Sequence, residues 1–281
     1  SAASDVYKRQ GLRSGTGGPN PAFVATEHQA DRRWWALRLL RRATRHAAAI
    51  SAVSEGVRQH LVAGGFPPEK VLTIPNGIDI LRVESAAAAS RAALGLPEQA
   101  TVALFVGRLA RQKGVDVLLE AFPRVCRDVP NLYLLIVGDG PLRGALERLA
   151  QRRGPAGRVH FLGRRDDVAA LLKAADAVVL PSRWEGLSLV LLEAMAARRA
   201  IVATQVAGNS EAIEHEKTGL LVPPEDAEAL ARAMRRLLED RRLAARLAEA
   251  ARETVGKYFT AERMACLFAE LYERVARPLE R

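Results

Sequence analysis

Aromatic residues and cysteines are scarce in this sequence, and several motifs of large protein classes are absent from it. Aromatic side chains make up 5% of the 281 residues, and the two cysteines, Cys126 and Cys266, are far apart. Their spacing fits neither a metal site nor a redox motif, so we expect two buried thiols in a reducing compartment. The five histidines show no metal-ligand cluster. No GK[ST] sequence is present, which argues against a P-loop nucleotide site.

Long apolar segments are also missing. No uncharged apolar run approaches the roughly 18 residues that a membrane span needs, and no signal peptide is visible. We therefore expect a cytoplasmic protein. The net charge of +10 fits an anionic membrane surface or phosphate-bearing ligands, and it fits equally well arginine-rich helices with a solvated basic face. No recognition motif supports nucleic acid as a partner.

What the sequence does contain is an alternation of strand-like and helix-like segments. Several of the apolar runs are continuous, as in strands that are buried on both faces of a parallel sheet. Amphipathic segments separate these runs, which predicts an α/β fold with a doubly wound sheet. The expected strands are 22–26, 47–51, 71–75, 101–107, 132–138, 158–163, 177–182, 200–204 and 219–222.

The strands are divided unequally along the chain, which predicts four regions. Residues 1–20 end in SGTGGPN and are expected to be a disordered or non-native tail. Residues 21–84 carry three strands, fewer than a Rossmann-like domain needs, and are interpreted as the remnant of an N-terminal domain with its linker. Residues 85–256 carry six strands and form a complete Rossmann-like domain. Residues 257–281, after an expected break at Gly256, supply a helix that packs back on the first domain.

Charged residues follow the ends of two expected strands, where ligands bind in such sheets. Strand 101–107 ends at Gly107, and Arg108 and Lys113 lie in the following loop, beside the start of a helix. Two cations at a helix N-terminus suit a diphosphate, although they also suit ordinary surface charge. The VGDGP sequence after strand 132–138 has Arg143 where a dinucleotide fingerprint has its third glycine.

The loop after strand 177–182 holds the second candidate group. Glu185 lies in the loop and Glu193 follows eight positions later, inside a helix. Carboxylates at this spacing can accept hydrogen bonds from two sets of sugar hydroxyls. The backbone N–H groups of Gly186, Leu187 and Ser188, at the start of that helix, can cradle a phosphate between them. The alternative is a plain loop charge at Glu185 and a partly exposed helix residue at Glu193.

Together these segments resemble family 4 glycosyltransferases, the retaining enzymes of the GT-B fold that use nucleotide-sugar donors. The resemblance covers residues 22 to about 256, in the family's order. It rests on the following segments: TEHQ (26–29), ISAVSEGVRQHL (50–61), IPNGID (74–79), VGRLARQKGVDVLLEAF (106–122), VGDGP (137–141), FLGRRDDV (161–168), ADAVVLPSRWEGLSLVLLEAMA (175–196), VAGNSEAI (206–213) and TGLLVPPEDAEALA (218–231).

The resemblance implies a role for each candidate residue. Glu185 would contact hydroxyls of the donor sugar, and Glu193 would contact the ribose of the nucleotide. Arg108 and Lys113 would bind the donor diphosphate, and His28 would lie near the donor sugar. A further pair in the FLG loop would lie near the base, namely Arg164 and Arg165.

The implied reaction is transfer of a sugar from a nucleoside diphosphate to an acceptor hydroxyl, with retention of configuration. The acceptor would be a sugar, a lipid-linked molecule or another hydroxyl compound, in polysaccharide or glycolipid synthesis. Protein cations would stabilise the leaving diphosphate, and no DxD motif is present, so no metal or other cofactor is expected. A non-catalytic fragment that only binds the nucleotide sugar is the alternative, because the first strands of the N-terminal domain are expected to be missing.

Three positions depart from the family pattern, and one segment admits two interpretations. Arg198 and Ala200 stand where a glycine and a proline usually follow EAMA, and Ala207 replaces the second glycine of a GG pair. The first change is expected to reshape a turn, and the last to alter a backbone approach to the donor.

The basic segment 32–47 contains two tryptophans and either packs within the first domain or lies on an anionic membrane at its cytoplasmic face.

Overall fold

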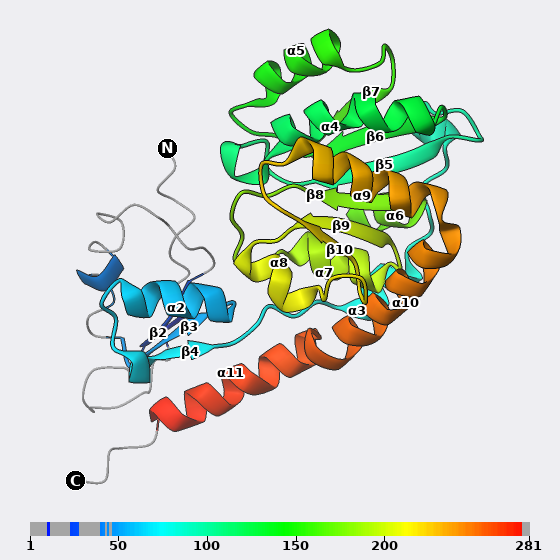
Figure 1. Ribbon diagram of the computed structural model, residues 1–281. Coiled ribbons are helices and arrows are strands. Elements are labelled where there is room, and N and C mark those ends of the chain that lie inside the picture. Colours follow the sequence, from blue (N-terminus) through cyan, green and yellow to red (C-terminus); the bar gives the residue numbers. More distant parts are fainter. Residues whose placement is uncertain (1–9, 12–22, 28–39, 43, 45–46, 277–281) are drawn as a thin grey trace, which may run out of the picture.

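The structure, a computed structural model, describes residues 10–11, 23–27, 40–42, 44 and 47–276. These residues form two α/β parts, which we call the first lobe and the second lobe after their order in the sequence (Figure 1). The first lobe contains a small sheet and the second a larger one. Among the described residues, no helix combines the length and the apolar character that crossing a membrane requires.

The sheet of the first lobe has four strands in the order β1-β2-β3-β4. The first pairing is antiparallel and the other two are parallel. The strand β1 falls within the segment 1–20 that we expected to be a tail. The elements of this lobe are β1 (Gln10–Gly11), β2 (Phe23–Glu27), β3 (Ala49–Ala52), α2 (Glu55–Ala63), η1 (Pro68–Lys70) and β4 (Val71–Thr73).

The sheet of the second lobe has six parallel strands in the order β10-β9-β8-β5-β6-β7. This is the doubly wound order in which the chain starts at a central strand and builds outward first on one side and then on the other. The fold class expected from the sequence is therefore confirmed. The strands are β5 (Thr101–Val106), β6 (Leu132–Val137), β7 (Val159–Gly163), β8 (Ala177–Leu180), β9 (Ala200–Thr204) and β10 (Leu220–Val222).

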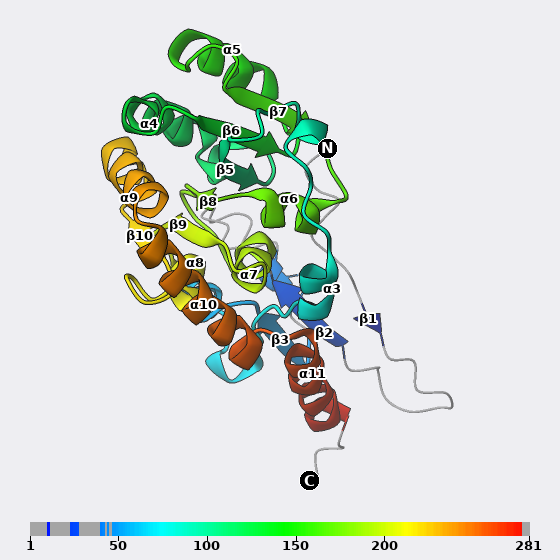
Figure 2. The same ribbon diagram turned by 90° about the vertical axis from the view of Figure 1, so that its right-hand side faces the viewer.

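Helices cover both faces of this sheet (Figure 2). One apolar cluster joins one face to α4, α5 and α9, and another joins the opposite face to α6 and α7. The helix α10 contributes to both clusters, with Leu247 in the former and Val255 in the latter. The helices are α4 (Val115–Asp128), α5 (Arg143–Arg153), α6 (Val168–Ala174), α7 (Leu189–Ala196), α8 (Ala207–Ala212), α9 (Ala227–Glu239) and α10 (Arg241–Tyr258).

The chain crosses between the lobes twice, and the two crossings are hydrogen-bonded to each other. Ile78 donates its N–H to the carbonyl of Phe259 at 3.0 Å, and its own carbonyl accepts from Ala261 at 2.9 Å. A Cβ on Gly77 would lie 2.1 Å from the carbonyl oxygen of Thr260, so only glycine fits there. The first crossing leads into α3 (Ile80–Ser85) and η2 (Ala92–Leu94).

The second crossing corrects one expectation about the C-terminal helices. Gly256 does not break the helix, because α10 continues to Tyr258. The break comes at Phe259 and Thr260, where the backbone bonds to the other crossing and the Thr260 hydroxyl accepts from the N–H of Arg263. The next helix, α11 (Ala261–Ala276), returns to the first lobe and packs its Leu271 with buried residues of the small sheet (Figure 1).

Candidate functional site

The two candidate loops meet at the centre of the large sheet. The strands β5 and β8 are neighbours there, although they are far apart in the sequence. Such a reversal of strand order opens a crevice at the carboxyl ends of the two strands, where doubly wound proteins bind ligands. The loop 107–114 leaves β5 at this end, and the loop 181–188 leaves β8. Both loops that the sequence singled out therefore lie at this switch point of the sheet.

A glycine allows the two loops to approach closely. Gly114 adopts the left-handed conformation, with φ of 62°, and a Cβ at this position would lie 2.0 Å from the carbonyl oxygen of Pro181. It follows η3 (Arg111–Lys113), a single turn of 3₁₀ helix. A side chain at position 114 would push the loops apart and carry Lys113 away from the loop after β8.

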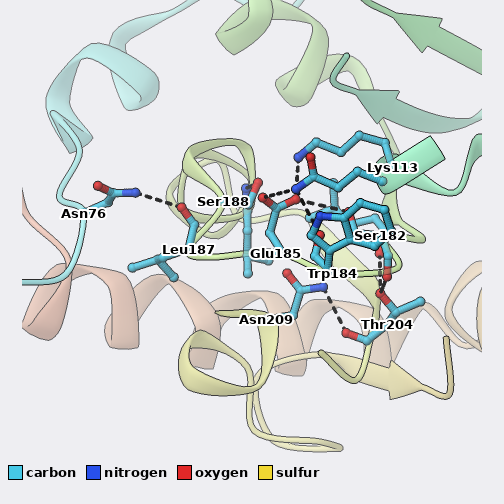
Figure 3. A network of polar contacts seen from close by, with 12 residues as sticks. Asn76, Lys113, Ser182, Trp184, Glu185, Leu187, Ser188, Thr204 and Asn209 are labelled. Atoms are coloured by element: carbon cyan, nitrogen blue, oxygen red, sulfur yellow. Dashed lines mark hydrogen bonds and ion pairs between the residues drawn. The ribbon is translucent and has the colours of Figure 1, made fainter. Parts of the chain in front are cut away.

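An ion pair joins the two loops. The ammonium group of Lys113 contacts Oε2 of Glu185, and the exposed fractions of these side chains are 20% and 8%. The same carboxylate accepts a hydrogen bond from Ser182 at 3.2 Å, and Gln112 lies 3.5 Å from its other oxygen. Figure 3 shows Lys113 and Ser182 beside Glu185. The structure thus brings together one residue of each candidate group.

The other residues after β5 lie beside this pair. A Cβ on Gly107 would lie 3.6 Å from Cε of Lys113, so the lysine stem runs close over the glycine backbone. The guanidinium group of Arg108 is exposed and has no hydrogen-bond or ion-pair partner among the described residues. It is therefore a cation whose donors are available to an anionic ligand.

Arg183 anchors the loop after β8 from its other side. Its guanidinium group donates two hydrogen bonds to Asp116 of α4, at 2.8 and 2.7 Å, and one to Glu225 at 2.8 Å. A fourth bond goes to the carbonyl of Arg111. The hydrogen bond from Arg183 holds the pKa of Asp116 below its usual value, against the opposing effect of burial. These bonds fix the loop that carries Glu185 to the start of α4.

A buried polar chain supports the same loop from β9 and α8. The Thr204 hydroxyl donates to the carbonyl of Ser182, and Asn209 donates from its side-chain nitrogen to the carbonyl of Thr204 at 2.9 Å. Asn209 is 1% exposed, and its side-chain oxygen has no partner among the described residues. Gly208 permits this packing, because a Cβ there would overlap the carbonyl oxygen of Gly186.

Glu193 lies on α7, the helix that follows the loop of Glu185. Its carboxylate is half-buried and forms no hydrogen bond with a described residue. Burial raises its pKa above the usual value, and the positive charge of Arg82 on α3 partly offsets that effect. The structure does not bring Glu193 and Glu185 into contact. It leaves Glu193 with unused acceptor capacity beside the segment that links the two lobes.

The start of α7 is held by two side chains. Ser188 is the N-cap, and its hydroxyl accepts a hydrogen bond from the N–H of Leu191. Asn76, on the first crossing between the lobes, donates to the carbonyl oxygen of Leu187 at 2.8 Å (Figure 3). The three residues predicted to cradle a phosphate, 186–188, therefore sit at a helix start that is fixed on both sides.

The predicted residues that remain are the two arginines after β7 and His28. Arg164 and Arg165 are exposed in the loop after β7, and Arg165 pairs with Asp167 at 2.7 Å. Arg164 has no partner among the described residues. His28 lies outside the described residues, as does the tryptophan pair of the basic segment.

Several residues of the site did not stand out in the sequence. Ser182 and Arg183 lie within a quoted motif, but sequence alone does not tell which side chains of an irregular loop point toward the neighbouring loop. Asn76 and Asn209 lie in the quoted IPNGID and VAGNSEAI segments, more than 20 residues from Glu185 along the chain. The only sequence signal for the two asparagines was their place in these family motifs. Their hydrogen-bond partners are backbone carbonyls, which a sequence pattern cannot identify.

Comparison with known protein families shows which family the chain belongs to. The profile of the family described as glycosyl transferases group 1 matches residues 87–254, and that of glycosyltransferase family 4 matches residues 7–82. The chain belongs to the group 1 glycosyl transferases. The first profile covers the whole second-lobe sheet, including both loops of the site. The second covers the sheet of the first lobe.

Two curated glycosyltransferases resemble the chain over about two thirds or more of its length. The α-D-kanosaminyltransferase of Streptomyces kanamyceticus is 35% identical over 216 residues, which are 74% of this chain and 56% of that enzyme. The lipopolysaccharide core biosynthesis glycosyltransferase LpsE of Rhizobium meliloti is 36% identical over 184 residues, 66% of this chain and 53% of that enzyme. The chain thus spans about half the length of these curated relatives.

A solved structure confirms the GT-B fold. The crystal structure of Anabaena HepE in complex with UDP and glucose superposes with a TM-score of 0.82 and 26% sequence identity. The superposition covers 89% of this chain and 71% of HepE. The same protein has also been solved with UDP-glucose.

Proposed function

We propose that this chain is the donor-binding part of a retaining glycosyltransferase, which moves a sugar from a nucleoside diphosphate to an acceptor hydroxyl. The observation that carries the proposal is the Lys113–Glu185 ion pair at the switch point of the large sheet. A cation for phosphate and a carboxylate for sugar hydroxyls stand side by side there, as a nucleotide sugar requires. The UDP and glucose named for HepE support a UDP-sugar as the first donor to test.

In the proposed reaction, negative charge grows on the diphosphate as the bond to the sugar breaks. Arg108 is free to meet that charge, and Lys113 can turn part of its hydrogen bonding from Glu185 to a phosphate oxygen. The N–H groups at the start of α7 add the positive end of a helix dipole. Preorganised donors of this kind stabilise a developing anion without a metal ion, and we propose none.

Each glutamate has a separate proposed role. Glu185 already accepts hydrogen bonds from Lys113 and Ser182, so its carboxylate is oriented before donor arrives and can receive sugar hydroxyls. Those bonds also withdraw charge from it, and we do not assign it as a nucleophile. Glu193 has unused acceptor capacity and a raised pKa, which suit a carboxylate that receives the ribose hydroxyls. Retention would follow from attack by the acceptor on the face that the diphosphate leaves.

The test is calorimetric titration of UDP, GDP and their glucose derivatives into the chain and into Glu193→Ala. Loss of the ribose contacts should weaken nucleotide binding about tenfold or more, because hydrogen bonds to a charged group contribute about 1.5–3 kcal/mol. Glu239→Ala, at the exposed end of α9, is the matched control and should bind as the unchanged chain does. A folded chain that binds neither nucleotide would overturn the proposal. Saturable binding with no transfer to any acceptor would instead favour a non-catalytic donor-binding fragment.

A further inference from the structure

Asn76 connects the linker between the lobes to the proposed phosphate cradle. It precedes Gly77 and Ile78, the residues of the first crossing that are packed and hydrogen-bonded against the second crossing. Its side chain leaves this crossing and reaches the loop after β8, 111 residues away, where it donates to the carbonyl of Leu187 at 2.8 Å. A single side chain therefore connects the first crossing to the loop after β8.

The geometry of the peptide group gives this contact a consequence. Leu187 and Ser188 share one planar peptide, in which the C=O and the N–H point in opposite directions. Figure 3 shows Asn76 on one side of this peptide and the Lys113–Glu185 pair on the other. Because Asn76 holds the carbonyl on its own side, the N–H of Ser188 is turned toward the side of the ion pair. No described residue accepts a hydrogen bond from that N–H.

We infer that Asn76 is a positioning residue that aims the Ser188 N–H at the donor diphosphate and ties this orientation to the crossing between the lobes. The inference rests on the proposed function, because the diphosphate is the anion that the N–H would meet. Leu187 is 5% exposed, so its carbonyl has little access to water as a substitute partner. Without the Asn76 donor, rotation of this peptide is the simplest way for the carbonyl to recover a hydrogen bond.

The experiment titrates UDP and uridine into the unchanged chain, Asn76→Ala and Asn76→Asp. Calorimetry measures the affinities, and NMR measures the amide chemical shifts. Asn76→Ala should weaken UDP binding about threefold to tenfold, the effect of one hydrogen bond. Asn76→Asp should weaken it further, because a carboxylate cannot donate and would face the carbonyl oxygen. Uridine lacks the diphosphate, so its affinity should be unchanged in both variants. The Ser188 amide resonance should move with UDP in the unchanged chain and lose most of that shift in Asn76→Ala.

The controls separate this inference from the proposed function. Asn131→Ala removes an exposed asparagine from the opposite end of the large sheet and should leave both affinities unchanged. UDP binding and a Ser188 shift that persist in Asn76→Ala would overturn the positioning role while leaving the proposed function intact. An equal loss of UDP and uridine affinity would also overturn it, since Asn76 would then act on the fold. Failure of the unchanged chain to bind any nucleotide would overturn both proposals together.

Discussion

The carboxylate of Glu211, on α8 of the second lobe, accepts two hydrogen bonds from the start of α2 in the first lobe. The donors are the backbone N–H groups of Glu55 and Gly56, each at 2.8 Å. Close packing accompanies the contact, because a Cβ on Gly56 would lie 2.5 Å from the Cβ of Ala207. The side chain of Ala207, where the family usually has glycine, thus faces a glycine on the other lobe. The carboxylate also meets the positive end of the α2 dipole.

Replacing Glu211 should loosen this contact between the lobes. Glu211→Ala leaves two N–H groups without their acceptor and should lower the free energy of unfolding by about 1 kcal/mol, as loss of a helix cap does. The sharper measurement is amide hydrogen exchange, which should accelerate at Glu55 and Gly56. Glu214→Ala is the matched control, because its carboxylate pairs with Lys217 on the same lobe. Unchanged exchange at the two amides would show that Glu211 does not hold α2.

Sequence patterns predicted the elements of this fold better than the contacts between them. The six strands of the second lobe are nearly continuous apolar runs, and burial on both faces requires that composition whatever the neighbouring strands are. The sequence predicts the break between the last two helices at Gly256, three residues too early. A glycine near a helix end can stay helical, and Gly256 lies inside α10. At Phe259 the partner is Ile78, more than 180 residues away, and that pairing leaves no local signal.

In the candidate site, too, the residues could be predicted from the sequence but their contacts could not. The strand order that brings β5 beside β8 makes neighbours of Lys113 and Glu185, which the sequence predicts separately for phosphate and sugar. Their direct ion pair was not expected. The anchoring by Arg183 was not expected either, because its partners Asp116 and Glu225 lie on segments that become adjacent only after folding.

Stability should depend on pH through Glu193. Burial raises the pKa of this carboxyl in the folded chain above its ordinary value near 4.5. Ionising a carboxyl whose pKa is raised by folding destabilises the folded state. The free energy of unfolding therefore falls as the pH rises from the unfolded pKa of Glu193 through its higher folded pKa. Glu193→Gln removes the cost. The variant should therefore have the higher melting temperature at pH 7.5, and the difference should shrink near pH 4.

Circular dichroism melting curves at the two pH values provide the measurement for Glu193. Glu239→Gln, at the exposed end of α9, is the control for loss of one surface charge. If Glu193→Gln shifts the melting temperature equally at pH 4 and pH 7.5, burial of the ionised carboxyl contributes nothing to stability.

The opposite pH dependence is expected at Asp116. The hydrogen bond from Arg183 lowers the pKa of Asp116 below its ordinary value near 3.8, so this pair stabilises the fold above that pH and loses its effect as pH falls through the lower folded pKa. Arg183→Ala should reduce the free energy of unfolding by about 1–2 kcal/mol at pH 7, since charge-assisted hydrogen bonds to a partly exposed carboxylate are lost. Urea unfolding at pH 7 and pH 3 is the measurement. The difference in unfolding free energy between Arg183→Ala and the unchanged chain should be smaller at pH 3.

A lysine at position 183 distinguishes charge from geometry. Arg183→Lys keeps the positive charge but cannot form the paired hydrogen bonds to Asp116, so an intermediate loss is expected. If the lysine variant equals the unchanged chain, the fixed geometry of the guanidinium group is irrelevant to the loop. Weaker UDP binding in both variants would follow from disorder of the loop that carries Glu185.

Arg198 occupies a backbone conformation that favours glycine. Its φ is 52°, and the N–H groups of Arg198 and Arg199 donate to the carbonyls of Met195 and Ala194, which closes the end of α7 in a Schellman turn. The turn therefore keeps the shape that the usual glycine would give it, contrary to the reshaping expected from the sequence. The side chain forms ion pairs with Glu84 at 2.9 Å and Glu249 at 2.9 Å, which partly offset the strain.

Comparison of Arg198→Gly with Arg198→Ala isolates the backbone contribution at this turn. Both variants lose the same two ion pairs, so their difference reports only the left-handed conformation, in which alanine is disfavoured by about 1 kcal/mol. Arg198→Gly should therefore be more stable than Arg198→Ala by about that amount in urea unfolding. Equal stabilities would mean that the turn relaxes when the ion pairs are gone, and that Glu84 and Glu249 hold Arg198 in its strained conformation.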